Sequence, residues 1–285
     1  MELGIGLPTM IPGMAGADLI ASAVRAEQRG FASLGVLDRL WYDGYEPLVT
    51  LAAAAGATRR IRLTTTILIA AYRGDRSLLA KQLAGVHRLS GGRLVVGVAA
   101  GGREDDFTAC GTPYQRRGRR LDTLLGDLRR TWSGGDDPLV PGPRLTDGGP
   151  PLLVGGHTPR AMRRAATHAS GWIAGGSSAS SYGDLAERAR QAWRDAGRTD
   201  PPRLVAIANV ALGRSAADRA GRFLLDYYGF LGWKAELAVK SLITEVGQLR
   251  EFTDAYRAVG CDELILFPCV PEPEHVDVLA EAVLR

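Results

Sequence analysis

The chain has 285 residues, of which 46% are hydrophobic and 23% are charged, the composition of an ordinary globular protein. Its length is close to the roughly 250 residues of a (β/α)8 barrel, so we expect a single domain over residues 1–285. No apolar run reaches the roughly 18 residues of a membrane span, and the start of the chain lacks the layout of a signal peptide. These features argue against a membrane protein and predict a cytoplasmic one.

The net charge of +4 does not by itself indicate a nucleic-acid partner. Arginines supply most of the positive charge and alternate with acidic residues along the expected helices, as on a solvated face. The densest basic cluster, RRGRR at 116–120, has no interleaved aromatic residues for base stacking, so no nucleic-acid binding is expected. The three cysteines, Cys110, Cys261 and Cys269, form no C-x-x-C pair and suit a reducing compartment.

Short apolar or β-branched runs alternate along the chain with amphipathic segments of helical length, which is the rhythm of parallel βα units. Eight strands are expected, at 3–7, 33–37, 61–69, 94–99, 151–154, 171–174, 203–211 and 263–267. Helices are expected near 17–29, 47–57, 76–88, 116–132, 158–168, 182–196, 215–228, 245–258 and 273–284. The regular alternation predicts an α/β fold of the closed (β/α)8 type, a TIM barrel.

Two segments interrupt this rhythm. Residues 133–150 are rich in glycine and proline and are expected to form a surface excursion. Residues 229–244 extend the seventh unit, and we expect them to add a helical turn over the mouth of the barrel.

In such a barrel the functional groups lie on the loops that follow the strands. The turn after the fourth strand contains Gly101 and Gly102, where a ligand can approach the backbone closely. The loops after the fifth and sixth strands read GGHTP at 155–159 and GGSS at 175–178. A helix N-terminus there would favour a phosphate by roughly 0.3–1 kcal/mol. A Gly-Gly pair before a helix often makes only a tight turn, but two on adjacent strands favour a phosphate site.

Several enzyme classes lack the residues that they require. The three lysines, Lys81, Lys234 and Lys240, fall on expected helices or in the second insertion, so no strand-end lysine could form a Schiff base. The four histidines have no metal-binding spacing, so no metal site is expected, and neither a G-x-G-x-x-G nor a P-loop motif occurs. An anion site with few acids or bases around it predicts that a bound cofactor carries the chemistry.

Five blocks of the sequence, taken in order, resemble the luciferase-like monooxygenase family of flavin-dependent barrel enzymes. They are the opening LGIGLP and residues 46–73, 90–111, 151–176 and 259–283, so the resemblance covers nearly the whole chain. It implies a (β/α)8 barrel, usually a homodimer, with a reduced flavin in the mouth. It assigns the flavin phosphate to Gly155, Gly156, His157, Thr158, Gly175, Gly176 and Ser177. It places Leu68, Ile69, Ala70 and Ala71 beside the flavin ring, and Gly101, Gly102 and Arg103 along the approach to it.

The chain departs from the family at the end of the second strand. Many relatives have a histidine directly after the acidic residue there, whereas this chain has Asp38 followed by Arg39. Arginine cannot shuttle protons at physiological pH, so Arg39 either pairs with Asp38 or another carboxylate, or binds an anionic substrate or a reacting oxygen. Glu104 is either a catalytic acid or a favourable charge near a helix start. Asp38, Arg39 and Glu104 are the candidate catalytic residues.

The resemblance implies a two-component monooxygenase that acts on a small organic substrate. A separate reductase would deliver FMNH2, O2 would add to the flavin as a C4a-peroxide, and the peroxide would transfer one oxygen atom to the substrate. Such a peroxide must be kept from water, so residues 229–244 and 103–115 are candidates for a lid.

Two alternatives stay open at this stage. Similar barrels bind a 5-deazaflavin coenzyme, which transfers hydride, and Arg73, Arg116 and Arg117 could suit its acidic tail. A barrel that binds flavin without catalysis would also be compatible with the missing histidine. The substrate is not predicted, because the residues that would select it lie on the least regular loops.

Overall fold

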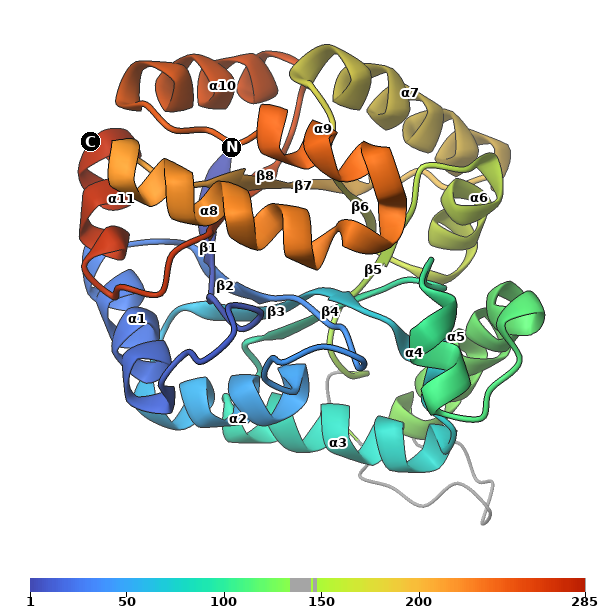
Figure 1. Ribbon diagram of the computed structural model, residues 1–285. Coiled ribbons are helices and arrows are strands. Elements are labelled where there is room, and N and C mark those ends of the chain that lie inside the picture. Colours follow the sequence, from blue (N-terminus) through green and yellow to red (C-terminus); the bar gives the residue numbers. More distant parts are fainter. Residues whose placement is uncertain (134–144, 146–147, 285) are drawn as a thin grey trace.

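The computed structural model describes residues 1–133, 145 and 148–284, and its eight parallel strands close into a barrel (Figure 1). The strands follow one another round the barrel in chain order, and the last pairs with the first, with Ile5 opposite Leu266. The predicted TIM barrel is confirmed. The strands are β1 (Glu2–Gly6), β2 (Ser33–Val36), β3 (Arg62–Leu68), β4 (Leu94–Val98), β5 (Leu152–Gly155), β6 (Gly171–Gly175), β7 (Arg203–Val210) and β8 (Glu263–Pro268).

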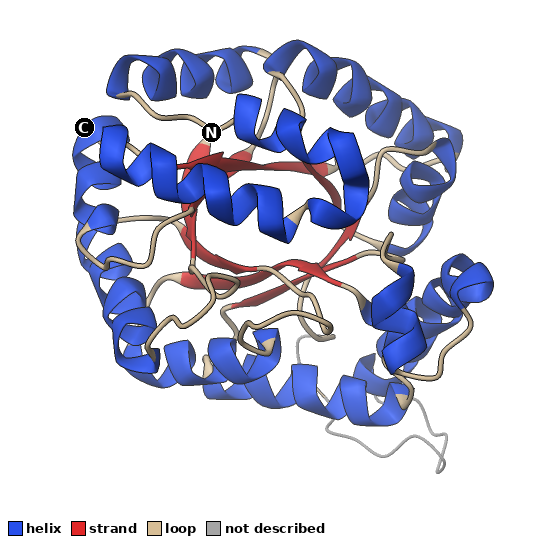
Figure 2. Cartoon of the chain, in the orientation of Figure 1, coloured by secondary structure: helices blue, strands red, loops and turns tan. Residues whose placement is uncertain are grey.

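A ring of helices surrounds the strands (Figure 2). Their ends follow local sequence signals: Thr158 caps α6 by accepting a hydrogen bond from the Ala161 N–H, and Gly30 ends α1 with a left-handed φ of 89°. Every expected helix is present within a few residues of its expected bounds. The helices of the ring are α1 (Gly16–Arg29), α2 (Pro47–Ala57), α3 (Arg76–Leu89), α5 (Arg117–Ser133), α6 (Pro159–His168), α7 (Ala179–Asp195), α8 (Arg214–Tyr227), α10 (Val246–Ala258) and α11 (His275–Val283).

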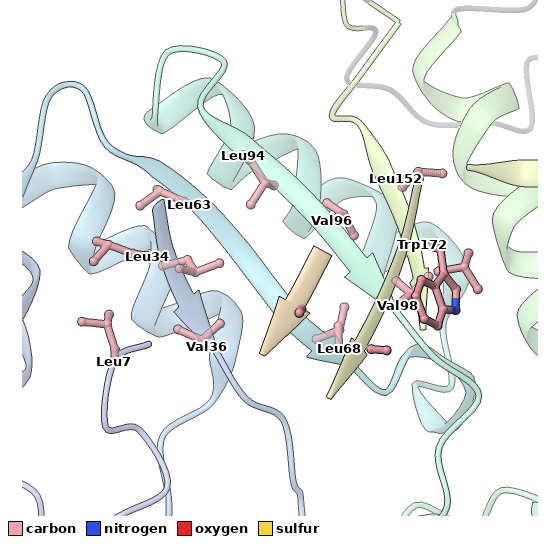
Figure 3. Packing of buried hydrophobic residues seen from close by; sticks show 14 of the residues in the cluster. Leu7, Leu34, Val36, Leu63, Leu68, Leu94, Val96, Val98, Leu152 and Trp172 are labelled. Carbon is pink, nitrogen blue, oxygen red and sulfur yellow. The ribbon is translucent and has the colours of Figure 1, made fainter. Parts of the chain in front are cut away.

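Most of the hydrophobic core lies between the strands and the helices. Figure 3 shows part of it, including the fully buried side chains of Leu34, Val96 and Trp172. Because side chains alternate along a strand, the other residues of each strand face the barrel interior. There they form a smaller cluster of Leu153, Ile173, Val205, Ile265 and Phe267. The interior is packed with side chains, which leaves the mouth as the place for a ligand.

Ion pairs close the opposite, N-terminal end of the barrel. The carboxylate of Glu263 is almost completely buried and accepts hydrogen bonds from Ser33 Oγ at 2.6 Å and from Arg203 at 2.8 Å. Arg62 also donates to Glu263, at 3.2 Å, and both arginines pair with Glu2 on the first strand. These contacts connect β1, β2, β3, β7 and β8, so this face supports the barrel rather than binding a ligand.

Short helical segments occupy the loops at the mouth. They are η1 (Ala70–Tyr72), α4 (Glu104–Ala109), η2 (Tyr114–Arg116), η3 (Gly229–Lys234) and α9 (Ala235–Lys240). The helical structure expected within 229–244 is confirmed by η3 and α9, whereas α4 has no counterpart among the expected helices because six residues show too little periodicity. Most of the excursion expected at 133–150 lies outside the described residues.

Two further features concern the whole of the described chain. Within residues 1–133, 145 and 148–284, no helix combines the length and the apolar character needed to cross a membrane. All three cysteines are free thiols: Cys110 is exposed at the end of α4, while Cys261 and Cys269 are buried.

Candidate functional site

A cavity of about 510 Å³ lies at the carboxyl ends of the strands, between the loops after β5 and β6 and the segment 229–240, which we call the lid. In Figure 1 the orange helices α8 and α9 cross in front of β7 and β8 at this mouth. From the loops, the cavity is lined by His157, Gly175, Gly176 and Ser177. From β7, α10, the lid and its flanks, it is lined by Ile207, Ala208, Asn209, Phe252, Tyr228, Leu231, Leu237, Ala238 and Ser241. Four of the residues predicted to bind flavin therefore share one cavity.

Gly175 and Gly176, which follow each other at the end of β6, are explained by two different physical requirements. A Cβ atom on Gly175 would lie 2.4 Å from Ile207 Cγ1, so a side chain there would collide with the barrel interior. Gly176 instead has a φ of +69° and faces open space, where a Cβ would meet no atom within 4 Å. The first glycine is required by packing, and the second leaves the backbone uncovered beside the cavity.

Two helices begin next to the cavity. Thr158 and Ser178 are the N-caps of α6 and α7, and each side chain accepts a hydrogen bond from the backbone N–H three residues later. The remaining N–H groups of each first turn have no partner within the helix, so the two N-termini together favour an anion.

His157 lies at the edge of the cavity with one side exposed to solvent. Its pKa lies below the ordinary value of 6.5 because partial burial disfavours the imidazolium ion, although a hydrogen bond with the Gly175 backbone acts in the opposite direction. The imidazole is therefore neutral at pH 7.

Four aromatic side chains, which we call the aromatic ladder, support the two loops from behind. They are Trp172, Tyr182, Tyr256 and Phe252, whose successive ring centroids are 5.6, 5.0 and 4.6 Å apart. Trp172, the first ring, donates a hydrogen bond from Nε1 to the Gly156 carbonyl at 2.8 Å. Tyr256, the third ring, donates from Oη to the Ser177 carbonyl at 2.6 Å.

These two hydrogen bonds set the direction of the neighbouring peptide groups. No cis peptide bond occurs in the described chain, and in a trans peptide the N–H points opposite to the C=O. Because the ladder holds the carbonyls of Gly156 and Ser177, the N–H groups of His157 and Ser178 point away from it. The ladder is a set of site residues that the sequence pattern did not indicate.

Asp38 lies on the other side of the mouth, where its side chain connects neighbouring loops. Its carboxylate is buried and accepts hydrogen bonds from the Ile69 N–H at 2.8 Å and from Tyr72 Oη at 2.6 Å. It also pairs with Arg73 at 3.3 Å. Burial, and next the negative charge of Asp38, raise the pKa of Tyr72, so this phenol stays protonated. Asp38 thereby fixes the end of β3 and the η1 turn to the loop after β2.

Arg39 does not pair with Asp38. Its guanidinium donates to the Tyr227 carbonyl at 2.7 Å, lies 3.7 Å from Asp105, and stacks 4.5 Å from the ring centroid of Tyr42. The same guanidinium lies 5.5 Å from the ring of Phe230 at the start of the lid. Of the interpretations that the sequence left open, the structure shows pairing with a carboxylate other than Asp38, together with a contact to the lid.

Arg103 contacts the lid from the loop after β4. It donates to Asp106 at 2.9 Å and to the Asp38 carbonyl at 2.6 Å, and its guanidinium lies 5.4 Å from the ring of Phe230. Phe230 therefore covers two arginines, Arg39 and Arg103. We call these three residues, together with Asp105 and Asp106, the latch.

Asp106 is the central acceptor of the latch. Its side chain is 1% exposed and accepts hydrogen bonds from the Leu40 and Trp41 N–H groups, at 3.0 and 2.9 Å, besides the one from Arg103. In the sequence, the only signal for this role is the pair of aspartates at 105 and 106. Glu104, the neighbouring residue that was a candidate catalytic acid, is exposed in the first turn of α4.

The remaining predicted flavin-binding residues lie elsewhere in the mouth. Leu68 is buried, and Ile69 is partly buried against the core. Ala70 and Ala71 line a separate cavity of about 320 Å³ together with Arg73, Arg76 and Arg120. The Gly101 and Gly102 carbonyls accept hydrogen bonds from Arg117 and Tyr114. The structure thus brings the residues after β5 and β6 together but gives those after β3 and β4 other surroundings.

Two sequence relatives each align with more than half of this chain. An uncharacterised protein of Mycobacterium tuberculosis is 29% identical over 213 residues, which is 64% of this chain and 73% of that protein. An F420-dependent hydroxymycolic acid dehydrogenase of the same species is 29% identical over 181 residues, covering 55% of this chain and 48% of the dehydrogenase.

Two solved structures share the fold over almost the whole chain. A monooxygenase from Streptomyces bottropensis superposes with a TM-score of 0.80 at 24% identity, covering 100% of this chain and 99% of the other. An F420-dependent secondary alcohol dehydrogenase superposes with a TM-score of 0.81 at 16% identity, covering 99% and 98%. Residues 1–276 match the family described as luciferase-like monooxygenase, and the chain therefore belongs to this family of oxidoreductases.

Proposed function

We propose that the chain is a two-component monooxygenase that uses FMNH2 and O2 to oxygenate a small organic substrate in the cavity under the lid. The observation that carries the proposal is the composition of the cavity. Its loops present glycine backbone at two adjacent helix N-termini, while β7 and the lid present mainly apolar side chains.

The residues present fit a flavin. The volume of about 510 Å³ falls within the roughly 300–1,000 Å³ of small-molecule sites. The N–H groups of His157 and Ser178 would hold the phosphate, and Ile207 and Phe252 offer apolar surface to the ring. When bound, the reduced flavin would supply the electrons with which O2 is activated and one oxygen atom is passed to the substrate.

The chain itself would orient the bound groups and keep water out. The guanidinium groups of Arg39 and Arg103 contact the ring of Phe230, and these contacts would keep the lid closed over the cavity. In this proposal Asp38 and Arg39 act by position, because their contacts fix the loops of the mouth. A separate reductase would supply the electrons, and the protein would form a homodimer, which size-exclusion chromatography would test.

A second candidate is hydride transfer with the deazaflavin F420. It is favoured by the F420-dependent dehydrogenase among the sequence relatives. The cavity beside Ala70 and Ala71 also favours it, because three arginines line that cavity and an acidic tail would suit them. In this case the coenzyme would exchange hydride with the substrate and O2 would not take part.

Titration of the purified protein separates these functions. FMN, anaerobic FMNH2, and oxidised and reduced F420 are each added, and binding is followed by fluorescence and calorimetry. Preferential binding of FMNH2 supports the monooxygenase, and tight binding of F420 supports hydride transfer. Binding without turnover in the presence of reductase, O2 and a substrate panel indicates a non-catalytic flavin protein, and binding of neither coenzyme rejects the proposal.

A further inference from the structure

The part of the cavity opposite the glycine loops is uncharged. It is built by Ile207, Ala208 and Asn209 from the end of β7, by Tyr228 at the end of α8, and by Leu231 and Leu237 of the lid. Among all described residues that line the cavity, none is an aspartate, glutamate, lysine or arginine. The described side chains of this half of the cavity therefore offer no opposite charge to an ionic ligand.

The nearby arginines already have partners. Arg39 donates to the Tyr227 carbonyl, and Arg103 donates to Asp106 and to the Asp38 carbonyl. Both lie against the ring of Phe230 and outside the lining of the cavity. A charged group placed between β7 and the lid would lose hydration without gaining a counter-ion among the described side chains, which disfavours its binding.

Two polar side chains interrupt this apolar surface. Asn209 at the end of β7 and Tyr228 after α8 both line the cavity. Burial raises the pKa of Tyr228, so its hydroxyl is protonated at neutral pH. A phenol and a carboxamide are both hydrogen-bond donors, and a carbonyl or hydroxyl oxygen is the group that they would bind.

We propose that the substrate is an uncharged molecule with an apolar carbon skeleton and one carbonyl or hydroxyl oxygen, and that Tyr228 and Asn209 bind this oxygen. The inference deepens the proposed function, since it rests on the cavity under the lid being the substrate site. Tyr228 and Asn209 would then select a neutral oxygen group, and the apolar surface around them would disfavour ions.

The test uses three small probes that share a cyclohexyl ring: cyclohexanone, cyclohexanecarboxylate and cyclohexylammonium. Their dissociation constants are measured by calorimetry at neutral pH, with the wild-type protein alone and loaded with whichever coenzyme it binds. In the coenzyme-loaded protein, where the phosphate fills the anion site at the glycine loops, we expect cyclohexanone to bind at least about tenfold more tightly than either ion, because only the ions must shed hydration without a partner.

Two variants locate the binding groups. Tyr228→Phe removes only the hydroxyl and should weaken cyclohexanone binding about two- to tenfold, the usual worth of one hydrogen bond. Tyr45→Phe is the matched control, because the Tyr45 hydroxyl donates to the Met14 carbonyl and does not line the cavity, and it should leave the affinity unchanged. Leu237→Lys places a positive charge at the cavity and should improve the binding of cyclohexanecarboxylate relative to cyclohexanone.

Carboxylate binding as tight as ketone binding in the coenzyme-loaded wild type would overturn the inference, as would an unchanged ketone affinity in Tyr228→Phe. The proposed function and this inference can fail separately. If neither FMNH2 nor F420 binds, the proposed function fails, while the effect of Tyr228→Phe on cyclohexanone binding to the coenzyme-free protein still decides whether Tyr228 binds a neutral oxygen function.

Discussion

The two sides of the barrel mouth differ in whether charged side chains contribute to them. Around β2 and β4, the carboxylates of Asp38 and Asp106 are buried, and each accepts at least one backbone N–H hydrogen bond and pairs with an arginine. Around β5 and β6, the surface toward the cavity is glycine backbone, and the described lining residues carry no charge. The comparison teaches that charge on the first side holds chain segments together, while the described surface facing the cavity on the second side consists of backbone dipoles and uncharged side chains.

The strongest test of the charged side is Asp106→Ala. This change leaves Arg103 buried without its carboxylate and frees two backbone N–H groups, so we expect the free energy of unfolding to fall by about 3–5 kcal/mol. Urea denaturation measures it. Asp254→Ala, at an exposed carboxylate that pairs with Arg257 on the surface, should cost less than about 1 kcal/mol. Equal losses in the two variants would remove the distinction between buried and surface charge.

The connection between the two sides is tested by Phe230→Ala. The ring covers both guanidiniums of the latch, and each contact contributes about 0.5–1 kcal/mol at a partly exposed site. We therefore expect faster amide hydrogen exchange across 229–240, with little change in the barrel strands. Leu225→Ala serves as the control, because this exposed residue of α8 offers no aromatic face. Unchanged exchange in the lid would show that the latch does not hold it.

The uncharged side is tested through the aromatic ladder. Tyr256→Phe removes the hydrogen bond to the Ser177 carbonyl but keeps the ring, so coenzyme affinity should weaken about two- to tenfold. Tyr182→Phe is the matched control, since Tyr182 stacks in the same ladder but its hydroxyl does not contact the loops. Titration with coenzyme, alongside thermal unfolding, separates the two roles. If Tyr182→Phe lowers the affinity as much as Tyr256→Phe, the hydroxyl does not position the loop.

The smallest effect concerns His157 and pH. The pKa of His157 is lowered in the free protein, and a bound phosphate would raise it, so binding would take up a proton. By linkage, FMN affinity should increase as the pH falls below neutrality, toward the lowered pKa of the free imidazole. Calorimetry across this range would show a shallower pH dependence for His157→Gln. An identical dependence in both proteins would place the phosphate away from this histidine.

The fold follows from local patterns to a large extent. Alternating apolar runs and amphipathic segments predict all eight strands and the nine helices of the ring, because each unit buries one face of its own. Two helix starts coincide with local signals, Pro47 at the first position of α2 and the cap Thr158 before Pro159 in α6. The short helix α4 was not predicted, because six residues give no measurable period. Long-range contacts stabilise it instead.

The candidate site was predictable only where its signal is local. The glycine pairs at 155 and 175 are visible as short motifs, and the structure brings both loops to one cavity, although only packing explains Gly175 itself. The hydrogen bond from Tyr256 to Ser177 joins residues 79 positions apart, and that from Trp41 to Asp106 joins residues 65 apart. No pattern in a single sequence reports such pairs, so the ladder and the latch could emerge only from the folded chain.

The distribution of the three thiols gives experimenters a ready means of observing the mouth. Burial raises the pKa of Cys261 to about 11 and that of Cys269 to about 12, so neither forms the reactive thiolate at neutral pH. Burial also raises the pKa of Cys110, but this thiol is exposed to reagents and ends α4, the helix that carries Asp105 and Asp106. A maleimide fluorophore should therefore attach at one defined position beside the latch, so the natural sequence can report lid motion in single-molecule experiments without an engineered cysteine.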